Sequence, residues 1–197
     1  MRLSHLARGL LILLATACAG SPASDGAPST GQSARAVADD VIVALATHDM
    51  PRVATLTHPA RGVRFSPYPF VDTTADRVVP ARDVATLWQL PTVARWGSFD
   101  GSGEPISLPY PAYHARFVYD VDFRHAPRVA VDSQPIGHGN STNNIADVYR
   151  GASIVEYHVP GRDSSMAGMD WRSLWLVLDR RQSRWYLVGI VHGAWTI

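Results

Sequence analysis

The sequence predicts a single α+β domain in which N-terminal helices pack on a strongly curved antiparallel sheet. Its 197 residues are enough for one domain and an N-terminal extension, and 46% hydrophobic against 18% charged residues is typical of a globular chain. Apolar residues between positions 37 and 48 recur at helical spacing, whereas the second half is rich in alternating strand patterns. A chain that begins with helices and ends with an antiparallel sheet typically packs the helices on one face of that sheet.

The first 17 residues have the pattern of an export signal. Arg2 and Arg8 give a basic start, and the apolar run LLILLATA follows at 10–17. That run is too short to span a bilayer, which needs about 20 apolar residues, but it has the length of a signal-peptide core. Cys18, the only cysteine, comes next. A plain secretory signal cleaved near residues 17–19, with Cys18 incidental, is the alternative.

The stretch LLATAC resembles a bacterial lipobox, which implies a lipoprotein signal peptide at 1–17 and lipidation of Cys18. The acyl chains would anchor the protein in a lipid bilayer, its first expected partner. Ala19 stands where Asp would follow in an inner-membrane lipoprotein. The resemblance therefore implies an exported cell-envelope lipoprotein, on the periplasmic face of the outer membrane if the organism is Gram-negative.

Residues 18–34 are predicted to be a lipidated flexible tether, because Ala, Gly, Ser, Pro and Thr dominate and nothing there can form a core. The folded domain is predicted over 35–197. Removal of residues 1–17 leaves 16 of the 18 basic residues against 17 acidic ones. This near-neutral balance argues against a nucleic-acid partner, which would require a clustered basic surface.

Four helices are predicted in the first part of the domain. The stripe between 37 and 48 predicts the first, and Asp49 can cap a second over 50–57, with Pro51 in its first turn. A third is expected over 81–90. Tyr110, Tyr113 and Phe117 indicate a fourth, shorter helix.

The strands follow from alternation and turn residues. Prolines interrupt 62–71, which predicts a short or edge strand. Residues 128–132 and 152–159 are expected strands, with a polar loop at 137–144 between them. Segments 171–179 and 184–197 predict a hairpin around the turn 180–183.

Several segments resemble a family of uncharacterised exported bacterial proteins and lipoproteins. They are HPARGVRFSPY (58–68), DGSGEPI (100–106), NNI (143–145), VEYHVPG (155–161), GMDWRSLWLV (168–177) and WYLVGIVHGAWTI (185–197). The resemblance covers about residues 35–197 and implies an NTF2-like fold, a cystatin-like cone in which N-terminal helices pack in a curved sheet whose open end makes a pocket. It implies no particular activity.

Glu156 and His158 are the first candidate site residues. Two positions apart on a strand, they point to the same side, and Tyr157 points to the other. In a pocket, a histidine beside a carboxylate could act as a general base. The alternative is a solvated outer face. Tyr157 is included as a candidate binding residue.

Arg172 and His192 complete the candidate set. Arg172 shares a strand face with leucines, which is costly unless its guanidinium meets a carboxylate or a ligand anion, and Glu156 is the expected partner. An Arg at a frayed strand end is the alternative. His192 shares a face with Tyr186, Val188 and Ile190, so it is either a pocket wall or a satisfied core residue.

Arg64, a candidate binding residue, lies in a loop-like context, as do His58 and Asp100, and these side chains could line the opening of a pocket. The alternative is that they only stabilise turns and helix ends. The eight histidines show no metal-ligand spacing, so no metal and no cofactor is predicted. The sequence thus favours a pocketed small-molecule-binding or accessory domain. The alternatives are a small isomerase- or hydrolase-type enzyme using Glu156 with His158 or His192 as acid and base, and a structural protein of the cell envelope that could form a homodimer.

Overall fold

The computed structural model describes residue 26 and residues 29–196, so the predicted signal peptide and the lipidation of Cys18 lie outside the described residues. The described chain is a single α+β domain built on a sheet of six strands. Their order across the sheet is β2 (Arg77–Val79), β1 (Val63–Ser66), β8 (Arg184–Ala194), β7 (Arg172–Arg181), β6 (Ser153–Val159) and β5 (Arg128–Val131). A separate two-stranded sheet pairs β3 (Ala94–Ser98) with β4 (Pro105–Leu108).

The sheet is mostly antiparallel, but the expectation of a wholly antiparallel sheet is wrong at one pair. β1 runs parallel to β8, with Phe65 opposite Ile190, whereas the other neighbours in this sheet run antiparallel. A long connection separates β1 from β8 in sequence, and such a connection permits either direction. The predicted hairpin is confirmed, and β7 and β8 turn at 182–183.

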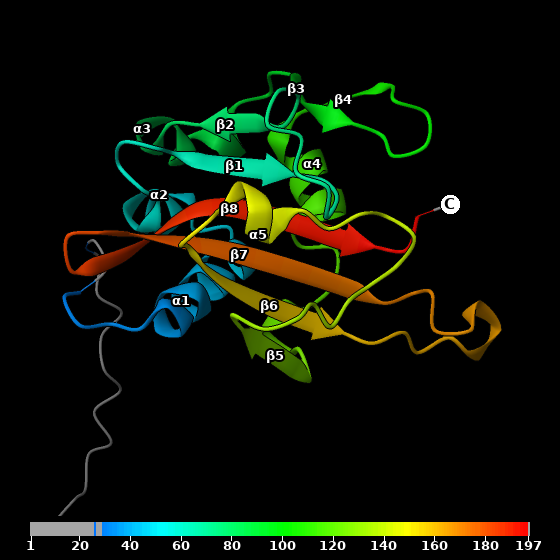
Figure 1. Ribbon diagram of the computed structural model, residues 1–197. Coiled ribbons are helices and arrows are strands. Elements are labelled where there is room, and N and C mark those ends of the chain that lie inside the picture. The colour runs from blue at the N-terminus through cyan, green and yellow to red at the C-terminus, as the bar shows by residue number, and fades with distance from the viewer. Residues whose placement is uncertain (1–25, 27–28, 197) are drawn as a thin grey trace, which may run out of the picture.

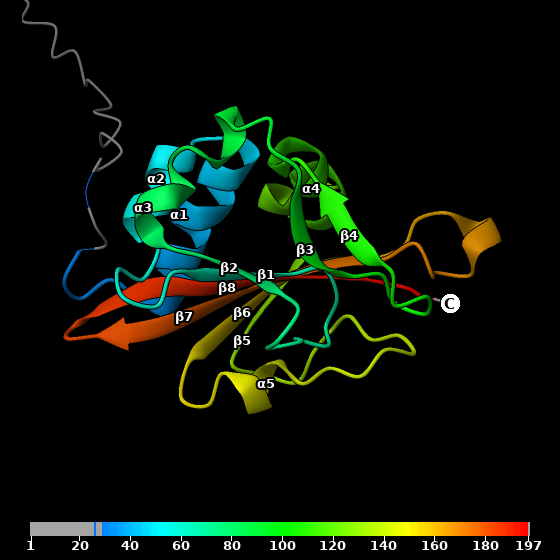
Figure 2. The ribbon, with the colours of Figure 1, turned by 90° about the horizontal axis from the view of Figure 1, so that it is seen from above.

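The sheet has a layer on each face, as Figure 2 shows in an edge-on view. One face carries α1 (Ala34–Ala46), α2 (Met50–Leu56), α3 (Ala81–Val84) and α4 (Tyr110–Phe117), together with the β3–β4 hairpin. The opposite face carries α5 (Ile145–Val148), which lies in front of β7 and β8 in Figure 1. Short 3-10 turns occur at Leu87–Gln89, Phe123–His125 and Ser164–Met166.

The helices form where capping and apolar spacing predict them. The Ser33 hydroxyl accepts a hydrogen bond from Ala36 N and begins α1, and the Asp49 carboxylate accepts one from Arg52 N and begins α2. The predicted helix over 81–90 is instead α3 followed by a 3-10 turn. Among the described residues, no helix combines the length and apolarity that crossing a bilayer would require.

Each face of the sheet has its own apolar core. Val155, Tyr157 and Leu174 pack in the larger core under the four helices, whereas Trp171 and Trp175 belong to the smaller one beneath α5. This division determines which of the candidate site residues can meet.

Candidate functional site

Glu156 lies on the α5 face of β6 and is 3% exposed. Its carboxylate accepts three hydrogen bonds of 2.7 Å, from the backbone N–H groups of Ile136 and Gly137 and from the Ser173 hydroxyl. The two amides belong to the loop between β5 and α5. Glu156 therefore ties this loop to the sheet, and its lone pairs are largely occupied.

His158 lies beside Glu156, as predicted, but Ser173 stands between them. The Nδ1 atom of His158 is 2.9 Å from the Ser173 Oγ and 4.0 Å from the Glu156 carboxylate. Since the Ser173 hydrogen goes to the carboxylate, Nδ1–H must donate to Oγ. Burial lowers the pKa of His158. In a nucleophilic triad the histidine lies between serine and acid, so this fully buried arrangement lacks the order that serine activation requires.

Arg172 does not pair with Glu156, which corrects the sequence-based expectation. Trp175 is the residue opposite Glu156, while Arg172 is opposite Val159, so the two side chains point to different faces of the sheet. Arg172 Nε instead donates to the Asp120 carboxylate at 2.6 Å.

His192 joins Arg172 at Asp120, where its Nε2 lies 3.1 Å from the second carboxylate oxygen. Burial alone would raise the pKa of Asp120, but hydrogen bonds from His192 and Arg172 lower it below its usual value. His192 Nδ1 is buried without a hydrogen-bond partner among the described residues. Asp120 could not be recognised from the sequence, because it lies just after α4 in a segment without a motif.

The expected set of four residues is thus divided between the two faces of the sheet. Tyr157, the other binding candidate on β6, lies on the helix face, where its hydroxyl donates to Asp39 of α1 at 2.7 Å. Burial and this hydrogen bond raise the pKa of Tyr157.

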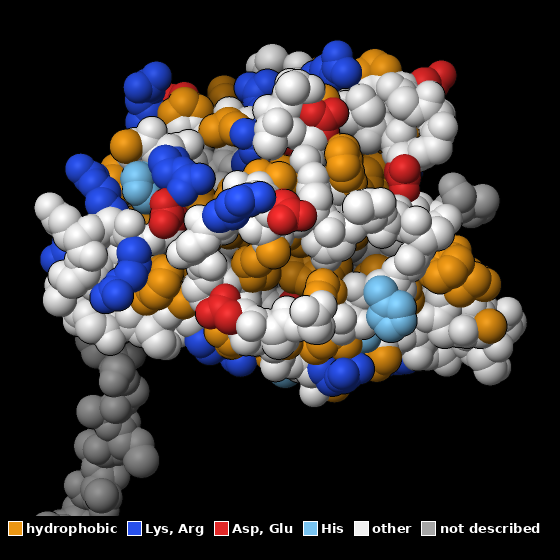
Figure 3. All heavy atoms as spheres, viewed as in Figure 1, with side chains coloured by type: hydrophobic (Ala, Val, Ile, Leu, Met, Phe, Trp, Pro, Cys, Tyr) orange, Lys and Arg blue, Asp and Glu red, His pale blue; other side chains and the backbone are white. Residues whose placement is uncertain are grey.

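A cavity of about 570 Å³ lies elsewhere, at the end of the sheet where three loops meet. The loops follow β1, join β3 to β4 and precede α5. Figure 3 views the side that carries α5, where apolar side chains are visible in hollows between polar ones. The lining residues are Pro67, Tyr68, Phe70, Asp72, Asp76, Ser98, Phe99, Asp100, Gly101, Gly103, Asn140, Ser141 and Thr142.

Asp76 is the buried carboxyl of this cavity, with 7% of the residue exposed. Its Oδ2 accepts a 3.0 Å hydrogen bond from Asp72 N, and no donor lies within hydrogen-bond distance of its Oδ1 among the described residues. The buried Ser66 hydroxyl, which itself has no partner within that distance in the described chain, is near enough to Asp76 to act to lower its pKa. Burial raises the pKa of Asp76 to about 6. Gly97 leaves room for this carboxyl, because a Cβ there would lie 2.8 Å from Oδ1.

Arg64 and Asp100 hold the loops around the cavity. Arg64 Nη1 donates to the carbonyl oxygens of Thr73 and Asp76, so it positions the segment that carries Asp76 and does not itself line the large cavity. The Asp100 carboxylate accepts hydrogen bonds from the hydroxyls of Ser141 and Thr196. Asp100 thus both lines the cavity and links loops, so the two interpretations of the sequence hold together, whereas no sequence motif marked Asp76.

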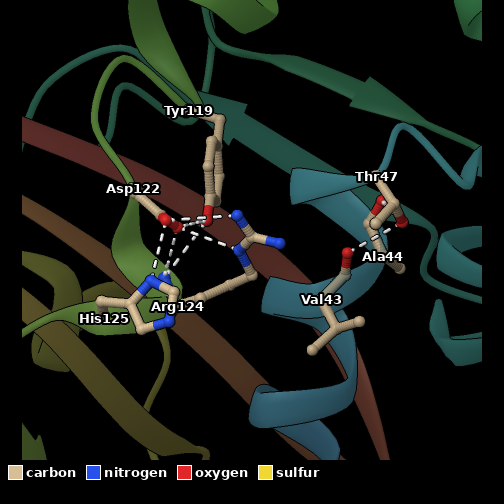
Figure 4. A network of polar contacts seen from close by, with 7 residues as sticks. All are labelled: Val43, Ala44, Thr47, Tyr119, Asp122, Arg124 and His125. Atoms are coloured by element: carbon tan, nitrogen blue, oxygen red, sulfur yellow. Dashed lines mark hydrogen bonds and ion pairs between the residues drawn. The ribbon is translucent and has the colours of Figure 1, made fainter.

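A second polar network lies on the helix side, around Asp122 (Figure 4). Tyr119, Arg124 and His125 all direct polar atoms at its carboxylate, and these contacts lower its pKa. All of these partners are within three residues of Asp122, and its carboxylate also caps a 3-10 turn. The network therefore stabilises a local turn.

The site was also considered for metal binding, and the sequence was compared with known proteins. Within the described part of the chain, no three His, Cys, Asp or Glu side chains are grouped so that they could hold a metal ion. No family model, no curated protein and no solved structure matches the sequence.

Proposed function

We propose that the protein is a membrane-anchored lipoprotein of the bacterial cell envelope whose domain binds a small molecule in the 570 Å³ cavity. Ligand sites typically enclose about 300–1,000 Å³ and combine apolar walls with a few placed polar groups. Tyr68, Phe70 and Phe99 supply the apolar walls here, and Asp76 and Ser141 the polar groups.

The observation that carries this proposal is the carboxyl of Asp76. A buried polar group without a partner destabilises the fold, and a buried charge does so more strongly. Asp76 lines the cavity, and its Oδ1 has no donor within hydrogen-bond distance among the described residues. A bound ligand would supply the missing partner and offset the cost of keeping this group buried.

We further propose that the domain is NTF2-like, with its helices packed in a strongly curved sheet. Support comes from the order of elements, with two helices first and a long hairpin last, and from four helices on one face of the sheet. The ligand cavity would then lie beside one end of the sheet, and the region under the helices would be filled by the larger core.

Binding is favoured over catalysis because the predicted acid–base residues are otherwise engaged. The Glu156 carboxylate accepts three hydrogen bonds, and His158 bonds to a buried serine. His192 and Arg172 share Asp120, and none of these residues lines the large cavity.

A fragment screen read out by NMR would test the proposal. Phe70 and Val43 are both about half exposed, at 53% and 54%, but only Phe70 lines the cavity. We expect fragments that bind the native protein to lose affinity in Phe70→Ala and to keep it in Val43→Ala. If no fragment shows this difference, the cavity is not a binding site and the proposed function is wrong.

A further inference from the structure

We propose that the ligand of this cavity is an organic monocation, an amine or ammonium compound with an apolar body. This inference rests on the proposed function and names its ligand class. It follows from the charge of the lining, from the open oxygen of Asp76 and from the aromatic walls.

The charged side chains that line the cavity are all acidic. They are Asp72, Asp76 and Asp100, and no arginine or histidine is among the described lining residues. Asp72 already accepts hydrogen bonds within its own turn, and Asp100 accepts them from Ser141 and Thr196 of other segments. Asp76 differs because it is buried and because its Oδ1 has no donor. An ammonium group could donate to this oxygen in a charge-assisted hydrogen bond.

Among the described residues, no arginine pairs directly with the Asp76 carboxyl, although the charge of Arg64 acts to lower its pKa. Arg64 directs its Nη1 at backbone carbonyl oxygens, and Arg77 lies over the Trp96 ring at 5.3 Å. Neither forms an ion pair with Asp76 within 4.0 Å. A buried carboxylate normally has such a partner, and a cationic ligand could supply one here.

The aromatic walls suit the same class of ligand. Phe70, Phe99 and Tyr68 line the cavity, and the faces of aromatic rings attract cations and pack against apolar groups. One ring already binds a cation, because the Arg116 guanidinium lies 4.9 Å from the centre of Phe99. Phe70 is half exposed and lines the cavity.

Three probes of nearly equal shape distinguish the effect of ligand charge from that of ligand shape. They are phenethylamine, phenethyl alcohol and phenylacetate. They carry charges of +1, 0 and −1 at neutral pH. We expect calorimetry at pH 7.5 to show phenethylamine binding at least about tenfold more tightly than either of the others, because a charged hydrogen bond exceeds a neutral one.

Substitution of Asp76 tests the named partner. Asp76→Asn keeps the shape and an acceptor for Asp72 N, and we expect it to weaken phenethylamine about ten- to a hundredfold while changing phenethyl alcohol little. Asp83→Asn, an exposed carboxylate on α3 outside the cavity, is the matched control and should leave all three affinities unchanged. If Asp76→Asn does not fold, Phe70→Ala, at a half-exposed position, should still weaken phenethylamine.

The pH dependence gives an independent readout. An alkylammonium stays protonated between pH 5 and 7.5, whereas Asp76, with a pKa of about 6, ionises over this range. The titratable groups that act on Asp76 are Asp72, Arg64, Tyr113 and Tyr149, and Asp76 is the one among them with a pKa in this window. Affinity for phenethylamine should therefore rise about tenfold from pH 5 to pH 7.5.

Two results would overturn the inference in distinguishable ways. Binding of phenethyl alcohol or phenylacetate at least as tight as that of the amine would exclude the cationic class and leave the cavity as a binding site. Failure of all three probes to bind, together with a fragment screen insensitive to Phe70→Ala, would overturn the proposed function as well.

Discussion

Replacing Glu156 with glutamine should destabilise the protein by loosening the loop over the α5 face. Glutamine keeps one oxygen for the Gly137 and Ser173 donors, but its NH₂ group would face the N–H of Ile136. Two donors then face each other at a site where Glu156 is 3% exposed. A hydrogen bond to a charged group contributes about 1.5–3 kcal/mol, and the two remaining bonds lose their charge, so we expect a loss of about 3 kcal/mol.

Urea unfolding of the native protein and of Glu156→Gln measures this difference. Glu104 is the only other glutamate in the sequence and is exposed, so Glu104→Gln is the control and should change stability by less than about 0.5 kcal/mol. Hydrogen exchange locates the effect, because the Ile136 amide should lose protection. A Glu156→Gln protein as stable as the Glu104→Gln control, with the Ile136 amide still protected, would refute the role of Glu156 in holding the loop.

Two further predictions concern the cluster of Arg172 and His192 around Asp120 and the proposed lipid anchor at Cys18. Asp120→Asn should cost about 2 kcal/mol at pH 7, less than for a fully enclosed pair because Arg172 is partly exposed. Because the folded pKa of Asp120 is lowered, its contribution is complete above its ordinary pKa of about 3.9 and is lost as the pH falls through the folded value. The difference between native and Asp120→Asn in urea unfolding should therefore shrink below about pH 4, and a gap that stays constant with pH would contradict this. Cys18→Ser should abolish labelling with a fatty acid and block signal cleavage; continued processing and labelling would show that Cys18 is not the lipidation site.

Alternation within each strand was predictable, because side chains on an extended chain point to opposite sides in turn. Glu156 and His158 share one face of β6, and Arg172 shares a face with the leucines of β7, as the pattern indicates. Which face of one strand matches which face of its neighbour depends on register, and a shift of one residue reverses it. The partner of Arg172 could not be found from the sequence for this reason.

An irregularity in β8 also changed which residues share a face of the sheet. The pairing of β7 with β8 shifts between Val177 and Leu178, and as a result Val188 packs in the smaller core while Ile190 packs in the larger one. His192 therefore does not share a face with Val188, contrary to the expected alternation. Gly189 lies at this irregularity and permits a close approach, since a Cβ there would lie 2.9 Å from the Tyr149 hydroxyl.

The large cavity lay beyond sequence reasoning because it is assembled from three separate loops. The prolines at 67 and 69 and the glycines at 101 and 103 predict turns. They do not predict that these turns lie next to one another in the fold. Asp76 stands in a polar segment where an exposed aspartate would be ordinary. Only its burial behind Gly97 distinguishes it.

The structure of the protein crystallised with phenethylamine tests the central claim most directly. The account predicts the ammonium nitrogen within about 3 Å of the Asp76 Oδ1, with the phenyl ring against Phe70 and Phe99. An amine bound elsewhere on the protein, with the cavity occupied by solvent alone, would contradict it.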